Sequence, residues 1–218
     1  MYVHLPAEGT CRAKALQEQQ IMATTLAECI VENLIAAAVV EKVDRELYVY
    51  GFFLLITRFF FFLVTIAFGC LLGIPFESVI FYIVFILLRS YAGGVHAKTE
   101  MACTAWTTLT IGMTITAIKI LESLNAGILP IFILENLCIW RLAPLDSAEK
   151  ILNFNEKKRY RLICNGLLVA CDGIVLTAVC FQIQILYYPV VCAAMLESVL
   201  LVAGRANNSK KKRNVPKN

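Results

Sequence analysis

Long apolar runs separated by short polar segments dominate the chain. A helix that crosses a bilayer needs about 20 mostly apolar residues, and six runs approach or reach that length. They predict membrane-spanning helices over Leu47–Leu72, Pro75–Leu88, Ala102–Leu121, Ala126–Trp140, Leu162–Gln182 and Ile183–Ala203. The second and fourth are short, so we expect them to tilt little or to extend beyond these bounds.

A different pattern precedes these spans, over residues 15–43. Apolar residues recur there at roughly helical spacing, and Glu28 and Glu32 lie between them. This spacing predicts an amphipathic helix that lies on the membrane or against the bundle. A seventh span is the alternative, but carboxylates inside a bilayer are costly and argue against it.

Composition supports a membrane protein. The chain is 59% hydrophobic and 17% charged, whereas a soluble domain is about 45–50% apolar and about 25% charged. We therefore predict an all-α polytopic membrane protein, with six transmembrane helices preceded by an N-terminal amphipathic helix. The prediction is a single membrane domain over residues 1–218, with the six-span bundle at 47–203 and a basic tail at 204–218.

The nine cysteines do not indicate a disulfide framework, because their number is odd and most lie inside apolar runs. Small apolar side chains suit the space between helices. We expect this packing role for Cys70, Cys138, Cys171, Cys180 and Cys192.

Lys and Arg predict the orientation, because they accumulate on the cytoplasmic side. With six spans and both termini inside, only Arg58 and Lys119 fall outside the cytoplasmic segments. The tail NNSKKKRNVPKN is typical of an anchor near anionic lipid. Nucleic-acid binding is the alternative for a basic run, and we expect no nucleic-acid partner.

The segment LLRSYAGGVHAKTEMACTAW, residues 87–106, carries the candidate chemistry. A cysteine is nucleophilic as its thiolate, which a neighbouring imidazole can generate. In a straight helix, however, the seven residues from His96 to Cys103 span about 10.5 Å along the axis, too far for a hydrogen bond. For a dyad to form, the backbone between Ser90 and Lys98 must therefore leave the helix, and Gly93-Gly94 allows it to do so.

The residues alone leave other interpretations open. His96 as an interfacial polar residue and Cys103 as a packing thiol would need no chemistry. Glu100 could orient His96, bind a basic part of a substrate, or face the surface. A zinc site would use these three ligand types, but no second histidine or Cys-x-x-Cys pair accompanies them. We expect no metal and no cofactor.

Around this segment the chain resembles the accessory gene regulator B (AgrB) family, membrane endopeptidases of peptide quorum sensing in Gram-positive bacteria. A second match is the loop APLDSAEKILNFNEKKRYR, which is similar to the family's Ala-Pro-x-Asp segment and basic helix. The resemblance runs from about Leu26 to Ala203. Its first motif consists of Arg89, Gly93-Gly94, His96-Ala97 and Cys103.

The resemblance implies a cysteine endopeptidase that removes the C-terminal tail of an AgrD-type precursor peptide. By motif position, Cys103 is the nucleophile and His96 its general base. Their product would be a peptidyl thioester, which a Cys or Ser of the peptide would convert into a thiolactone or lactone ring. Substrate binding or structural support is expected of Arg89, Gly93, Gly94, Glu100, Lys157, Lys158 and Arg159.

Two other functions compete with the peptidase. One is a small exporter that uses intramembrane Asp172 and Glu197, although no inverted repeat or broken-helix pair supports it. The other is a non-catalytic scaffold that presents the precursor. Charges inside spans tend to pair, and Arg58 is the candidate cation for a buried carboxylate.

The expected partners are the AgrD-type precursor and membrane lipid. A homodimer is compatible with the family, although no heptad or small-xxx-small pattern argues for one. The expected location is the cell membrane of a Gram-positive bacterium, as a multi-pass protein with both termini cytoplasmic.

Overall fold

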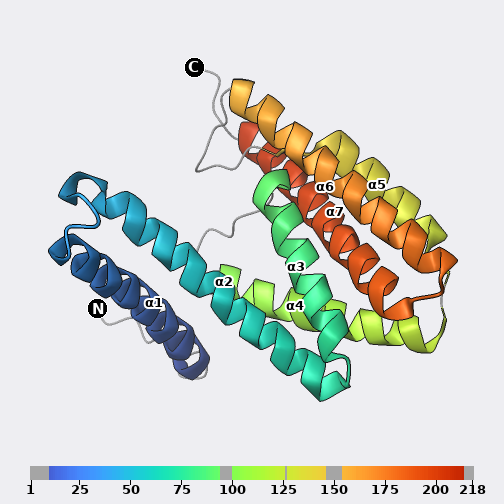
Figure 1. Ribbon diagram of the computed structural model, residues 1–218, viewed down its shortest axis with the longest axis horizontal. Helices are drawn as coiled ribbons and strands as arrows, with labels where there is room; N and C mark the ends of the chain where they lie inside the picture. The colour runs from blue at the N-terminus through green and yellow to red at the C-terminus, as the bar shows by residue number, and fades with distance from the viewer. Residues whose placement is uncertain (1–9, 94–99, 126, 146–153, 214–218) are drawn as a thin grey trace, which may run out of the picture. The chain divides into compact units, whose positions relative to one another are not determined.

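The computed structural model describes residues 10–93, 100–125, 127–145 and 154–213. Every long element in these ranges is an α-helix, which confirms the all-α prediction. The elements are α1 (Thr10–Ala36), the short 3-10 helix η1 (Lys42–Asp44), α2 (Arg45–Leu72), α3 (Pro75–Ala92), α4 (Glu100–Ser123), α5 (Leu129–Leu142), α6 (Phe154–Cys180) and α7 (Gln184–Arg213) (Figure 1).

Five helices within the described residues are long and apolar enough to cross a membrane: α2, α3, α4, α6 and α7. Many of their large apolar side chains are exposed, including Leu55, Leu71 and Leu176, as expected of surfaces that face lipid. Helix α5 has only 14 residues, fewer than a spanning helix usually needs. A polytopic membrane protein is therefore confirmed, while the count of six spans stays a prediction.

The predicted helix bounds agree best with the structure where a glycine or a proline marks the end or the start of a helix. Helix α2 ends at Leu72, and Gly73 follows with a φ of 74°. Proline then begins α3, where its missing N–H leaves no backbone bond unmade. By contrast, α6 begins eight residues before the predicted Leu162, and α7 continues ten residues beyond the predicted Ala203. Both extensions are polar helix outside the apolar run.

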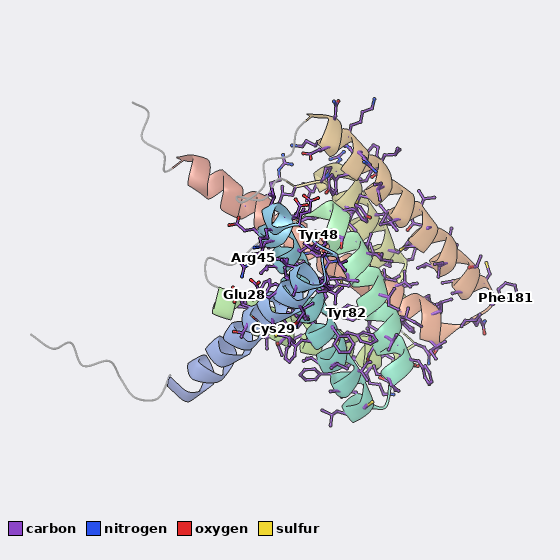
Figure 2. The ribbon with its side chains drawn as sticks, turned by 60° about the vertical axis from the view of Figure 1, so that its left-hand side comes forward. Glu28, Cys29, Arg45, Tyr48, Tyr82 and Phe181 are labelled. Carbon is purple, nitrogen blue, oxygen red and sulfur yellow. The ribbon has the colours of Figure 1, made fainter. Side chains whose placement is uncertain are left out.

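The chain divides into two compact units, each described separately below. The first comprises Met1–Val64 and Lys98–Thr108. In it, the helix predicted over residues 15–43 begins earlier, at Thr10, and ends at Ala36. Its residue Glu32 pairs with Arg45 at the start of α2, with 2.7 Å between Oε1 and Nε; Arg45 is labelled in Figure 2. Whether α1 lies on the membrane stays a prediction.

The second unit comprises Thr65–Ala97 and Leu109–Asn218. In it α7 contacts α3, α5 and α6, and these helices lie side by side in Figure 1. Small buried residues of α7 allow this close approach; they include Cys192, Ala193 and Ala194. Cys192 thus packs as predicted, whereas Cys70 and Cys180 are exposed and do not pack between helices.

Polar groups inside the second unit pair across helices, as expected of charges within spans. Asn136 on α5 donates a hydrogen bond from Nδ2 to the Asp172 carboxylate on α6, at 2.9 Å. Three other carboxylates among the described residues of this unit, Glu77, Glu135 and Glu197, are buried. The cation beside Glu197 is Arg89, and a pair between Arg58 and a carboxylate stays a prediction.

Candidate functional site

The turn after α3 requires glycine. Helix α3 ends at Ala92, and Gly93 follows with φ 78° and ψ −158°, a region that is essentially restricted to glycine. A Cβ atom at Gly93 would also collide with the carbonyl oxygen of Leu145. Both the backbone conformation and the close approach therefore exclude a side chain here.

This turn is joined to the segment that follows α5. The N–H of Leu145 donates to the carbonyl of Ala92 at 2.9 Å, and Gly93 and Leu145 form an isolated parallel β-bridge. We call these three residues the glycine clasp. It brings together the two sequence motifs, which are about fifty residues apart in the chain, and it satisfies a carbonyl that a helix end leaves open.

Arg89, in the last turn of α3, supports the glycine clasp from inside the bundle. Its Nη1 donates to the carbonyl of Gly93 at 2.9 Å, and the same atom lies 3.7 Å from Oε1 of Glu197 on α7. The Arg89 side chain is 20% exposed and that of Glu197 is fully buried. A cation at a helix C-terminus is favourable in its own right, because the helix dipole is negative there.

Cys103 lies in the first turn of α4, which begins at Glu100. The side chains of both residues lie outside the described part of the structure, and so do Gly94 and His96. Cys103 belongs to the first unit and Gly93 to the second. The pairing of His96 with Cys103, the role of Glu100 and the expectation of no metal therefore all stay predictions.

A cationic cavity of about 460 Å³ borders the glycine clasp. Leu145 is part of its wall, and among the described residues its charged lining is entirely basic. Such a concentration of one charge in a recess attracts anions. The basic residues are Arg141, Lys157, Lys158, Arg161 and Arg205.

This cavity is lined by two of the three basic residues of α6 that the sequence offers for substrate binding or structural support, and that role stays a prediction. Lys157 and Lys158 line it, but Arg159 is exposed elsewhere on α6 and does not. The sequence had suggested only orientation for Arg141 and Arg205. No local sequence pattern indicates that these two residues line one cavity. Arg141 lies in the last turn of α5, and Arg205 lies 64 positions later, in the part of α7 beyond the apolar run.

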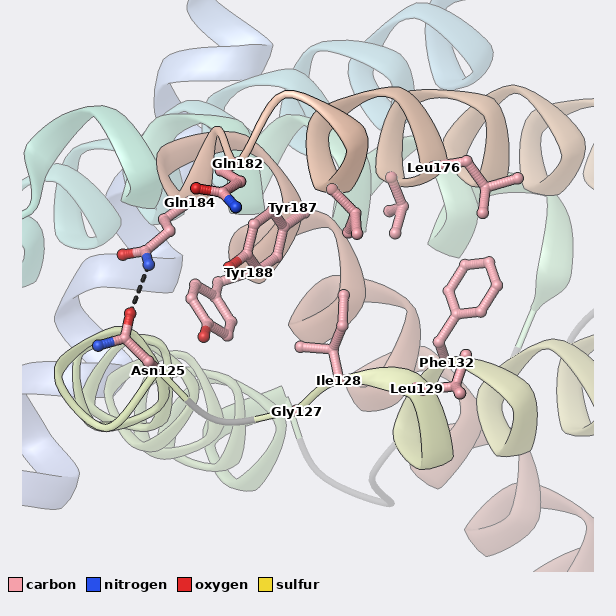
Figure 3. Close-up of a pocket in the computed structure, with 12 residues that line it drawn as sticks. Asn125, Gly127, Ile128, Leu129, Phe132, Leu176, Gln182, Gln184, Tyr187 and Tyr188 are labelled. Atoms are coloured by element: carbon pink, nitrogen blue, oxygen red, sulfur yellow. Dashed lines mark hydrogen bonds between the residues drawn. The ribbon is translucent and has the colours of Figure 1, made fainter.

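The opposite end of the same helices has an uncharged cavity of about 640 Å³ (Figure 3). Its apolar wall includes Ile128, Phe132 and Leu176. At its rim, the Gln184 side chain donates a hydrogen bond to the Asn125 side chain. No sequence motif indicated this cavity.

Comparison with known proteins identifies one family. The model of "Accessory gene regulator B" matches residues 23–202 of the chain. No curated protein and no solved structure matches it.

Proposed function

The chain belongs to the accessory gene regulator B family, and from this premise we propose that it is the membrane cysteine endopeptidase that removes the tail of an AgrD-type precursor. Membership already implies a part in processing the signalling peptide of agr quorum sensing, with such a precursor as partner. The proposal adds the reaction and the residues that carry it.

The proposed reaction has two acyl transfers. His96 takes the proton of the Cys103 thiol, and the sulfur bonds to the scissile carbonyl carbon while the peptide C–N bond breaks. The leaving amine of the tail takes the proton from His96. A thiol or hydroxyl of the bound peptide then attacks the thioester, releasing Cys103 and closing the thiolactone or lactone ring.

One observation carries this proposal: the helix that precedes His96 ends before it, and a new helix begins before Cys103. Helix α3 ends at Ala92 and α4 begins at Glu100, so the motif from Arg89 to Cys103 is not carried by one continuous helix. Gly93 has a conformation that only glycine tolerates, which fixes the point of departure. The start of α4 also supports a thiolate, because the helix dipole is positive there.

The cationic cavity supports the choice of substrate. An acidic tail is the group that five basic side chains would attract, and the cavity adjoins the glycine clasp that precedes His96. Attraction of a flexible acidic segment by exposed cations is weak per contact and sensitive to salt. Several contacts together would nevertheless hold the tail near the site of cleavage.

The test is coexpression of the full chain with an AgrD-type precursor in membranes, followed by mass spectrometry of the peptide products. We expect Cys103→Ala and His96→Ala to insert normally and to release no tail. Cys138→Ala is the matched control, since it removes a described thiol of α5 and should leave cleavage unchanged.

The same preparation separates the alternatives. Tail release that persists in Cys103→Ala would contradict the proposal and favour a scaffold for another protease. Loss of activity on thiol alkylation, together with resistance to chelators, would agree with a cysteine nucleophile. Export without cleavage in all variants would favour a transporter.

A further inference from the structure

We propose that Glu197 is a positioning residue, which acts through Arg89 to fix the glycine clasp and thereby the segment that carries His96. The inference rests on the proposed peptidase function and adds a residue of α7 to it. Glu197 stands about one hundred residues from the motif in the sequence and would touch neither substrate nor nucleophile.

The first step is the geometry around one nitrogen. Nη1 of Arg89 donates to the Gly93 carbonyl at 2.9 Å and lies 3.7 Å from the Glu197 carboxylate. The two interactions therefore share an atom, and the position of the guanidinium decides both. A residue on α7 is in this way coupled to the first residue of the turn.

The second step is burial. The Glu197 side chain is fully buried, and no hydrogen-bond donor among the described residues reaches either of its carboxylate oxygens. A buried charge is retained only when an opposite charge compensates it. The Arg89 guanidinium supplies that charge, so the pair holds the two side chains at one place between α3 and α7.

The third step is that the packed helices hold the pair in place, and the pair in turn holds Gly93. Helices α3 and α7 pack along each other, and they share a core cluster that includes Leu88 and Ala92 of α3 and Leu201 of α7. Gly93, in contrast, has no side chain that could pack against the core. Its carbonyl is fixed by Arg89, and its backbone by the bridge to Leu145. His96 follows Gly93 by three residues. Loss of the hydrogen bond from Arg89 to the Gly93 carbonyl would therefore also change the position of His96.

The test compares Glu197→Gln with wild type in proteoliposomes that contain an AgrD-type precursor. Glutamine keeps the shape of the side chain and removes its charge. We expect kcat for tail release to fall by about 10-fold, with KM within about 2-fold, because substrate contacts are unchanged. Glu197→Asp, which keeps the charge, should restore part of kcat.

A second readout separates positioning from mere stability. The rate at which iodoacetamide alkylates Cys103 is followed against pH, by mass spectrometry of the peptide that contains it. A base in place makes the thiol reactive at lower pH than a free cysteine, for which the midpoint is about 8.5. In Glu197→Gln this midpoint should move toward that of a free thiol.

Asp172→Asn is the matched control. It also removes an intramembrane carboxylate, but one that pairs with Asn136 between α5 and α6. It should leave kcat and the alkylation profile unchanged.

Wild-type kcat and an unshifted alkylation profile in Glu197→Gln would overturn the positioning role, whereas inactivity of Cys103→Ala would still uphold the peptidase. If Glu197→Gln does not reach the membrane, Arg89→Lys gives the same test. It keeps the charge and loses the planar group that serves both partners. Wild-type kcat and profile in Arg89→Lys would likewise overturn the inference.

Discussion

The two ends of the bundle formed by α5, α6 and α7 are built from the same helices but have different chemistry. At one end, five basic side chains line a cavity that adjoins the glycine clasp. At the other, the lining residues are apolar or carry amide and phenol groups, and none is charged among those the structure describes. Figure 3 shows the second end.

The difference indicates which end of the bundle suits the proposed binding and cleavage of the precursor. Positive charge collects on the cytoplasmic side of membrane proteins, so the cationic end is the end predicted to face the cytoplasm. That end also holds Gly93 and Leu145, which belong to the two motifs, and the pair of Arg89 and Glu197. The uncharged end has a larger cavity, yet none of the motif residues that the structure describes lies there. Cavity size alone would have selected the end without described motif residues.

The largest expected effect is that of Gly93→Ala, which alters the end of the bundle that holds the glycine clasp. Alanine would be strained at this φ and ψ and would collide with Leu145. We expect the rate of tail release to fall by about 100-fold, which corresponds to roughly 3 kcal/mol. The rate is measured per molecule of membrane-inserted protein.

Gly166→Ala is the control for this substitution, because nothing lies within 4 Å of a Cβ atom at that position on α6. It should cleave as wild type does. Equal loss of activity in both variants would mean that the effect at Gly93 is not specific to the turn.

A smaller effect is expected from the cationic cavity. Replacement of Arg141, Lys158 and Arg161 together by Gln should raise KM for a precursor with an acidic tail by about 10-fold, since exposed ion pairs contribute about 0.2–1 kcal/mol each. The increase should shrink at high ionic strength, because salt screens exposed charges. Peptide cleavage is measured at low and at high NaCl.

Arg159→Gln separates the effect of the cavity residues from that of basic charge elsewhere on α6. Arg159 is exposed on α6 but does not line the cavity, so its replacement should change KM by less than about 2-fold. A triple variant with unchanged KM would refute tail binding at this end.

The smallest effect is expected at the uncharged end. Gln184→Ala removes the hydrogen bond to Asn125, and a bond of this kind contributes about 0.5–1.5 kcal/mol. The thermal midpoint in detergent should fall by about 2 °C, with tail release unchanged. A large loss of cleavage in this variant would show that the two ends are coupled.

Helix bounds were predictable from the sequence wherever the apolar run and the helix begin or end at the same residue. The end of α2 at Leu72 and the start of α3 at Pro75 agree with the predicted bounds. The start of α6 at Phe154 does not. Hydropathy reports the part of a helix that suits lipid, whereas the backbone hydrogen bonds continue through Asn155–Arg161, where the side chains are polar.

The candidate site was predictable only where its residues are neighbours in the chain. Gly93-Gly94 next to His96 indicates a break in the helix, and α3 does end at Ala92. The partner of Glu197 was not predictable, because any intramembrane cation is an equal candidate from sequence. Packing of α3 on α7 selects Arg89, and that choice depends on three-dimensional register rather than on pattern.

The early start of α6 has a consequence for how a peptide first meets the protein. The eight residues from Phe154 to the apolar run extend about 12 Å along a rigid axis, at 1.5 Å per residue. Ionic screening at physiological salt decays over about 8 Å. Lys157 and Lys158 lie five and four residues before the apolar run, about 6–7.5 Å along this axis, which is within that screening length. A negatively charged peptide would therefore meet these charges on a rigid helix, and the ionic strength of the medium would set the distance over which they attract it.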